Sequence, residues 1–187
     1  MIFLSTVILN YLYLERRFTM RNDKPNSLYI EDAKILPGKF RHFSGIKDAF
    51  NGKGDINFCI VIPVESVDEL ISQGWSIKCL EPRTEEDSPT YFLKCKVNFD
   101  SNWPPMVEMV QVRGTRYVSK TPLDEDSIKC LDRADIISVD VDLNPSRWER
   151  DDGTVGFTPY VTRMVAVVRE NRFDTKFAID DDVPFEE

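Results

Sequence analysis

The chain alternates apolar and polar residues over long stretches, and this period of two constrains its fold more than any other feature. Residues 90–99 alternate cleanly. Residues 136–148 and 154–169 form two long strand patterns, and the sequence Asp151-Asp152-Gly153 between them is typical of a hairpin turn. Because successive side chains of a strand point to opposite faces, these segments predict sheet structure with one apolar and one polar face.

Shorter patterns predict more strands and two short helices. Ser66 and Glu69 have the spacing of a capping box, which predicts a helix that stops at Gly74, and Asp124 is expected to cap a second helix through Leu131. Further strands are expected over 28–36, 56–62, 75–80, 106–114 and 115–120. Because helices do not alternate with strands, the pattern favours a mainly β fold, a small antiparallel barrel or sandwich, over a doubly wound sheet.

The length of 187 residues and a hydrophobic content of 42% fit one domain of ordinary size. We expect this domain to span residues 27–170. Residues 1–26 are expected to be an N-terminal extension, either disordered or translated from an upstream start, with a short membrane anchor as the alternative. Residues 171–187 lose periodicity, become acidic and predict a disordered C-terminal tail.

Cysteine and histidine usage argues against metal and redox chemistry. The four cysteines are isolated in apolar runs and are expected to be reduced and buried in the core, which indicates a cytoplasmic protein. With His42 as the sole histidine, we expect no metal, no cofactor and no catalytic centre. The alternative is a small nuclease that binds Mg²⁺ through Asp140 and Asp142, which share one face of a predicted strand.

Charge is unevenly distributed along the chain. The formal net charge is -8, which excludes a uniformly basic nucleic-acid binder. Residues 174–187 contain six acidic residues and Lys176, a net charge of -5. The tail thus carries more than half of the net negative charge, and the rest of the chain can form a basic face.

Four segments combine cations with aromatic rings. Cations can neutralise phosphates, and rings can stack on unpaired bases. We expect one of Phe40 and Phe43 to be exposed, and Phe92 to share an outer strand face with two lysines. The alternative is that these are ordinary core or solvent-facing residues. The candidate nucleic-acid-binding residues are Lys39, Phe40, Arg41, Phe43, Lys53, Phe92, Lys94, Lys96, Arg113, Arg116, Tyr117, Arg147 and Trp148.

The end of the chain combines an acidic run with a compact apolar group. It reads Asp180, Asp181, Asp182, Val183, Pro184 and Phe185, followed by Glu186 and Glu187. Consecutive aspartates favour an extended and solvated segment, and proline fixes its own backbone. This composition suits a hydrophobic pocket of a partner protein that is rimmed by basic residues.

The sequence DDDVPF resembles the acidic tip, typically DDDIPF, of bacterial single-stranded DNA-binding proteins. The body resembles phage-encoded members of that group over 55–59, 74–78 and 94–99. The resemblance implies an OB-like β-barrel that binds single-stranded DNA without base preference in phage replication or recombination, in the host cytoplasm. It also implies that the tail recruits replication or recombination proteins. In the bacterial tip the phenylalanine is the last residue, whereas Glu186 and Glu187 follow Phe185 here.

Two further questions stay open from the sequence. A phage protein–protein adaptor that binds no nucleic acid is the alternative to a DNA-binding protein. An exposed edge strand would allow a homodimer, and no membrane partner is expected.

Overall fold

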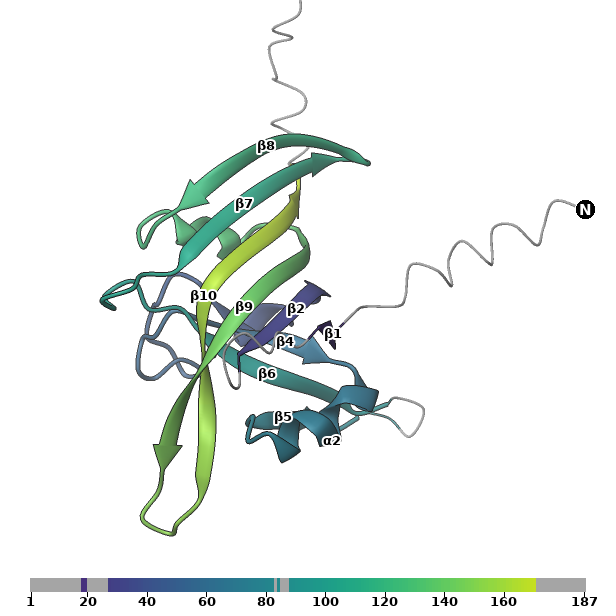
Figure 1. The fold of residues 1–187 in the computed structure, drawn as a ribbon. Helices are drawn as coiled ribbons and strands as arrows, with labels where there is room; N and C mark the ends of the chain where they lie inside the picture. Colours follow the sequence, from purple (N-terminus) through teal and green to yellow (C-terminus); the bar gives the residue numbers. More distant parts are fainter. Residues whose placement is uncertain (1–17, 20–26, 83, 85–87, 171–187) are drawn as a thin grey trace, which may run out of the picture.

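The computed structural model describes residues 18–19, 27–82, 84 and 88–170 (Figure 1). The predicted mainly β fold is confirmed, and the described residues contain one α-helix, α2 (Val64–Ser72). Two short 3₁₀ helices are η1 (Gly38–Phe40) and η2 (Ile128–Asp132). The strands are β1 (Phe18–Thr19), β2 (Leu28–Ala33), β3 (Arg41–His42), β4 (Asn57–Ile62), β5 (Ile77–Leu80), β6 (Thr90–Lys96), β7 (Met106–Arg113), β8 (Arg116–Leu123), β9 (Ile136–Glu149) and β10 (Val155–Arg169).

The strands form one sheet that is mixed rather than wholly antiparallel. Its order is β1-β2-β9-β10-β6-β4-β3, and β10 runs parallel to both β6 and β7. The segment after β2 pairs with β4. The Leu36 amide donates to the Cys59 carbonyl, and the Val61 amide donates to the Lys34 carbonyl. Backbone pairing therefore runs from β2 through β9, β10, β6 and β4 back to the segment that follows β2.

Strands β9 and β10 form the long hairpin expected from the sequence, and they run through the whole molecule (Figure 1). Their turn closes where the Gly153 amide donates to the Arg150 carbonyl, and Gly153 adopts a φ of 80°, a conformation that favours glycine. The turn end of the hairpin projects from the sheet. Its other end supports β7, which pairs with Arg163–Arg169 of β10.

The hydrophobic core follows the predicted alternation in β6. Leu93 and Cys95 are fully buried, and they meet Leu143 of β9 and Met164 of β10 in the same core. Phe43 and Phe58 also lie in this core with their rings stacked at 5.2 Å. Burial of this kind contributes about 25 cal/mol for each Å² of apolar surface removed from water.

Two local expectations need correction. Helix α2 begins at Val64, two residues before the expected capping box, and Pro63 precedes it without a side-chain cap. The cysteines are all free, as expected, but only Cys59 and Cys95 are buried, while Cys79 and Cys130 are exposed. Burial raises the pKa of the Cys59 thiol to about 11.

The N-terminal extension contributes one described feature. Phe18 and Thr19 form β1 and pair with Ile30 and Tyr29 of β2. Among the residues that the structure describes, no helix has the length and apolarity needed to cross a membrane. The acidic tail, residues 171–187, lies outside the described residues.

Candidate nucleic-acid interface

An open groove of about 620 Å³ lies between the outer face of β5 and β6 and the projecting turn end of the β9–β10 hairpin. Four parts of the chain contribute to it: the loop before β4, the segment that leads into β5, strand β6 and the hairpin. The lining residues are Lys53, Ser76, Ile77, Lys78, Lys94, Lys96, Trp148, Arg150, Phe157, Thr158 and Pro159.

Five of the lining residues are cations, and none is acidic. Lys94 and Lys96 face outward from β6 because Leu93 and Cys95, on alternate positions, occupy the core. Lys78 stands on the neighbouring strand, where it pairs with Phe92. Lys53 and Arg150 reach the groove from loops on its two sides. In a chain with a net charge of -8, this arrangement concentrates positive charge at one place.

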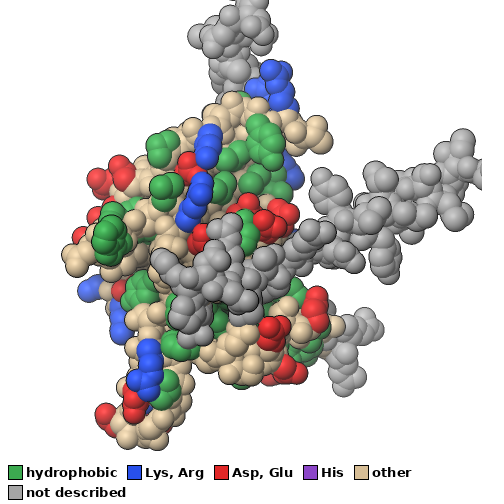
Figure 2. Space-filling model, in the orientation of Figure 1, with side chains coloured by type: hydrophobic (Ala, Val, Ile, Leu, Met, Phe, Trp, Pro, Cys, Tyr) green, Lys and Arg blue, Asp and Glu red, His purple; other side chains and the backbone are tan. Residues whose placement is uncertain are grey.

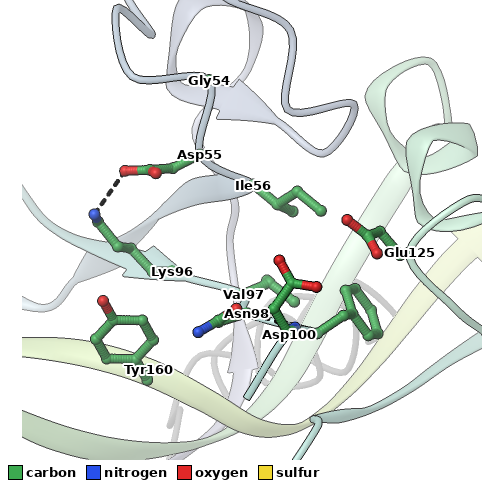
Figure 3. Close-up of a pocket in the computed structure, with 10 residues that line it drawn as sticks. Gly54, Asp55, Ile56, Lys96, Val97, Asn98, Asp100, Glu125 and Tyr160 are labelled. Atoms are coloured by element: carbon green, nitrogen blue, oxygen red, sulfur yellow. Dashed lines mark hydrogen bonds and ion pairs between the residues drawn. The ribbon is translucent and has the colours of Figure 1, made fainter.

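Lys96 stands at the boundary of the groove. Its Nζ lies 2.6 Å from Asp55 Oδ2, and this hydrogen bond is the main cause that lowers the pKa of the Asp55 carboxyl (Figure 3). On the other side of Lys96 is a pocket of about 250 Å³ whose lining includes Asp55, Asp100 and Glu125. The basic groove therefore ends where this acidic pocket begins.

Two aromatic rings complete the hairpin side of the groove. Trp148 lies against Gly156 on the paired strand, so closely that a Cβ added at Gly156 would meet the indole at 2.5 Å. The Arg150 guanidinium lies over the same indole, 5.2 Å from its centre, at cation–π distance. Phe157 packs on buried Trp75 with the ring centres 6.0 Å apart. The hairpin thus presents two supported rings beside the five cations.

A second basic and aromatic cluster lies further along the same outer face. Lys39 Nζ is 5.4 Å from the centre of the Phe40 ring and 5.3 Å from that of Phe50. Phe50 is 60% exposed. Lys39 and Phe40 line a pocket of about 310 Å³ with Leu80 and Thr90, the residues that end β5 and begin β6. The cluster therefore extends the surface beyond Lys78 and Lys94.

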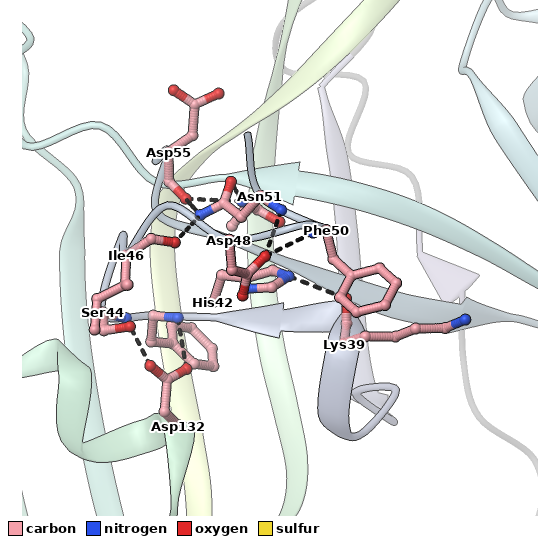
Figure 4. A network of polar contacts seen from close by, with 11 residues as sticks. Lys39, His42, Ser44, Ile46, Asp48, Phe50, Asn51, Asp55 and Asp132 are labelled. Atoms are coloured by element: carbon pink, nitrogen blue, oxygen red, sulfur yellow. Dashed lines mark hydrogen bonds and ion pairs between the residues drawn. The ribbon is translucent and has the colours of Figure 1, made fainter. Parts of the chain in front are cut away.

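Buried polar contacts fix the loop that carries this cluster (Figure 4). His42 is buried, and its Nε2 lies 3.0 Å from the Lys39 carbonyl. The Asp48 carboxylate accepts hydrogen bonds from the Phe50 and Asn51 amides, each at 2.7 Å. These contacts give His42 a structural role and hold Lys39 and Phe50 on one surface.

Three predicted site residues offer little free surface to a ligand, because the fold gives their side chains other contacts. Phe43 is 0% exposed in the core, and its amide donates to Asp132. Phe92 faces outward as predicted but is only 6% exposed, because the Phe40 ring covers it edge-on at 5.5 Å. The Arg41 guanidinium donates to the Asp132 and Ala134 carbonyls and so connects β3 to the end of η2. Of the alternatives Phe40 and Phe43, Phe40 is the more exposed.

Four other predicted residues lie apart from the groove. Arg113, Arg116 and Tyr117 belong to the β7–β8 hairpin, which pairs with the C-terminal half of β10, whereas the groove uses Phe157–Pro159 at its start. Arg147 is exposed beside the groove, and its guanidinium pairs with Glu149 at 3.1 Å. The groove itself gathers Lys53, Lys94, Lys96 and Trp148 from the predicted set.

The structure adds four residues that are absent from the list of candidate residues. Phe50 lies in a segment that the sequence marks as basic and aromatic, and Arg150 lies two residues after Trp148. Lys78 follows the alternation of β5, so the strand pattern could have identified it. Nothing local distinguishes Phe157, whose position depends on the pairing of β10 and on the contact with Trp75.

The acidic pair considered for a nuclease, Asp140 and Asp142, contacts other residues of the fold. Asp140 Oδ1 accepts a hydrogen bond from the Asp32 amide at 2.8 Å, and burial raises the pKa of the Asp140 carboxyl. Asp140 and Asp142 line a pocket with Tyr29 and Arg163. Within the described part of the chain, no group of three or more His, Cys, Asp or Glu side chains could hold a metal ion.

Comparison with solved structures finds single-stranded DNA-binding proteins of a bacteriophage. The single-stranded DNA-binding protein from bacteriophage Enc34 in complex with ssDNA is 10% identical, with a TM-score of 0.48, over 86% of this chain and 99% of that chain. A second structure, described as the single-stranded DNA-binding protein from bacteriophage Enc34, is also 10% identical, with a TM-score of 0.47, over 89% of this chain and 98% of that chain. No curated protein matches the chain.

Comparison with protein families gives a match over most of the chain. The family model described as "Putative phage ssDNA-binding domain" matches residues 18–187. The match includes the described domain and the acidic tail, and the chain belongs to this family of phage ssDNA-binding domains.

Proposed function

We propose that the protein binds single-stranded DNA without base preference in the groove between β6 and the β9–β10 hairpin. The observation that carries this proposal is the lining of the groove, in which five cations stand beside Trp148 and Phe157 without a carboxylate. Membership of a family described by ssDNA binding supports it. Cations neutralise the phosphates, and the rings stack on bases whatever their identity.

The arrangement suits an unpaired strand better than a duplex. Stacking on Trp148 and Phe157 requires bases that are free of their partners, and it is worth about 1–3 kcal/mol for each base. Lys39 and Phe50 extend the path along β6, on the side away from the acidic pocket beside Lys96. The strand would therefore run from the hairpin across Lys94 and Lys78 toward Phe50.

We interpret the strand arrangement as OB-like. In this interpretation, β2 with residues 34–36, β4, β6, β9 and β10 form the five-stranded ring, and β7–β8 is an addition between β6 and β9. OB folds bind oligonucleotides on one face, between the loops that flank it. The groove lies on the corresponding face here, between the loop before β4 and the turn of the β9–β10 hairpin.

We also propose that the protein acts in phage DNA replication or recombination and that its acidic tail recruits partner proteins. Val183, Pro184 and Phe185 would occupy an apolar pocket of the partner, and the aspartates before them would pair with basic residues around it. As a tethered polyanion, the tail would also compete with DNA for the cations of the groove.

Removing a groove lysine tests the proposed function directly. We expect oligo-dT to bind far more tightly than duplex DNA, and Lys78→Ala or Lys94→Ala to reduce the slope of log affinity against log salt by about 0.7 each. Tryptophan fluorescence titrations at several salt concentrations measure both quantities. Lys129→Ala, at an exposed position of η2, is the matched control and leaves the slope unchanged. Equal affinity for duplex and single strands would refute the proposal.

The contact between Trp148 and Gly156 gives a test of stacking. In Gly156→Ala the added Cβ would meet the indole at 2.5 Å, so Trp148 has to move away from its support. We expect affinity for oligo-dT to fall by at least about fivefold, the equivalent of about 1 kcal/mol. Gly52→Ala is the control, because its Cβ meets nothing within 4 Å. Unchanged affinity in a Gly156→Ala protein of normal thermal stability would exclude Trp148 from the interface.

The ion pair of Lys96 predicts a variant that binds more tightly. In Asp55→Asn the carboxylate that competes with phosphate for Lys96 is removed, while the Asp55 carbonyl still accepts from Asn51 and Asn57. We expect higher affinity and a salt slope that is steeper by about 0.7. Because the pKa of Asp55 lies below its ordinary value, the difference from wild type stays constant between neutral pH and mildly acidic pH. Exposed Asp126→Asn controls for net charge, and weaker binding by Asp55→Asn would contradict the assignment.

Truncation tests the competition by the tail. Removing residues 174–187 deletes six acidic residues and Lys176, so the net charge rises by five. We expect the affinity for oligo-dT to stay equal or to increase, because no phosphate-binding cation of the groove is lost. An electrophoretic mobility shift measures the change, and a clear loss of affinity would show that the tail contributes to DNA binding.

A further inference from the structure

We propose that copies of this protein contact one another head to tail along a single strand, with β8 of one copy against α2 of the next. This inference rests on the proposed function, because the bound strand brings the copies together. It assigns a role to two surfaces that the groove does not use. The partner is a second copy of this chain, and the argument rests on charge and exposure.

The first surface is the β7–β8 hairpin. Within the described residues β8 pairs only with β7, and nearly all of its residues are exposed. Tyr117 is 74% exposed beside exposed Val118 and Arg116. Residues 111–123 contain three cations and no acidic residue. Within the described residues Arg113 pairs with Glu170 and Lys120 with Glu108, so Arg116 is the cation that this surface offers to a partner. A large exposed aromatic ring beside arginine is the composition that recurs in protein-binding hot spots.

The second surface is the exposed flank of α2. Val67 and Leu70 bury one side of the helix, and Val64 and Ile71, which border that side, are exposed at 68% and 52%. Because Val64, Asp68 and Ile71 are spaced by four and three residues, they form one stripe along this flank. Glu65 lies beside this stripe, and the helix contains no cation. The surface is thus apolar and acidic, whereas that of β8 is apolar and basic.

The two surfaces lie at opposite ends of the molecule. Figure 1 places β7 and β8 at one end and α2 at the other. Figure 2 shows Lys and Arg side chains among hydrophobic ones over the β7–β8 end, with some Asp and Glu side chains beside them, and Asp and Glu side chains over the α2 end. Neither surface includes a residue that lines the groove. Contact between copies therefore leaves the groove open to the strand.

Charge decides between a symmetric dimer and a chain of copies. A twofold contact through β8 would bring the Arg116 side chains of both copies together, whereas Lys120 is paired with Glu108 of its own copy. A twofold contact through α2 would bring Glu65 and Asp68 together. Like charges that face each other destabilise a contact. Only the contact of β8 with α2 pairs opposite charges. Such a heterologous contact generates an open-ended row of copies, which suits a linear polymer as ligand.

The test uses charge reversal on each surface. One variant is Arg116→Glu, and the other combines Glu65→Lys with Asp68→Lys. Binding is measured on an oligonucleotide of about 15 nucleotides, which holds about one copy, and on one of about 60 nucleotides, which holds several. Exposed Lys129→Glu controls for a reversed charge outside both surfaces.

We expect wild type to bind the long strand cooperatively, with affinity per site at least about tenfold higher than on the short strand. Each reversed variant, used alone, loses this gain because like charges then face each other, while its affinity for the short strand stays within about threefold of wild type. An equimolar mixture of the two variants restores the gain, because each altered surface then meets an oppositely charged one.

Three outcomes would overturn the inference. Non-cooperative binding of wild type to the long strand, or a mixture that fails to restore cooperativity, excludes the contact of β8 with α2 while the proposed function stands. If Arg116→Glu loses affinity for the short strand, β8 contacts DNA instead of a second copy. Failure of wild type to bind either strand would refute the proposed function, and this inference with it.

Discussion

The two faces of strand β6 lie in different environments, one in the core and one away from it. The arrangement of the surrounding elements depends on which side chains occupy each face. Leu93 and Cys95 face the core, where they meet residues of β9 and β10. Lys94 and Lys96 face away from it on alternate positions. The strand is paired with β4 on one side and with β5 and β10 on the other, so its two lysines are surrounded by other elements rather than standing at an edge. A slip of one residue in this register would bury two ammonium groups and expose the core.

The period of two predicted most of the strands and the β9–β10 hairpin, because alternation and turn residues are local properties. It also placed Lys94, Lys96 and Phe92 correctly on the outer face. It could not show that Phe40 covers Phe92, since that contact joins a 3₁₀ turn to a strand about fifty residues later. The alternation also could not show that Phe43 is more buried than Phe40. The burial of Phe43 depends on the stacking of its ring on Phe58 and on the hydrogen bond from its amide to Asp132.

Electrostatics explain why composition alone was a poor guide to the site. The groove collects its cations from four separate segments, and one of these cations, Lys96, pairs with the carboxylate of Asp55. Basic runs in the sequence instead mark both the groove and the β7–β8 hairpin, which the fold places at different parts of β10. Lys78 and Phe157 join the groove through strand pairing and not through sequence proximity.

The Arg150 guanidinium over Trp148 has a consequence for the protein before it meets a ligand. The indole is held between Gly156 and a cation, so the hairpin turn does not present a bare aromatic plane to other apolar surfaces. In the proposed binding mode, a base that stacks there would replace the guanidinium, which would then be released next to the incoming sugar–phosphate chain. Occupancy of the indole would thus be an exchange of one partner for another, and release of the strand would leave no exposed hydrophobic surface behind.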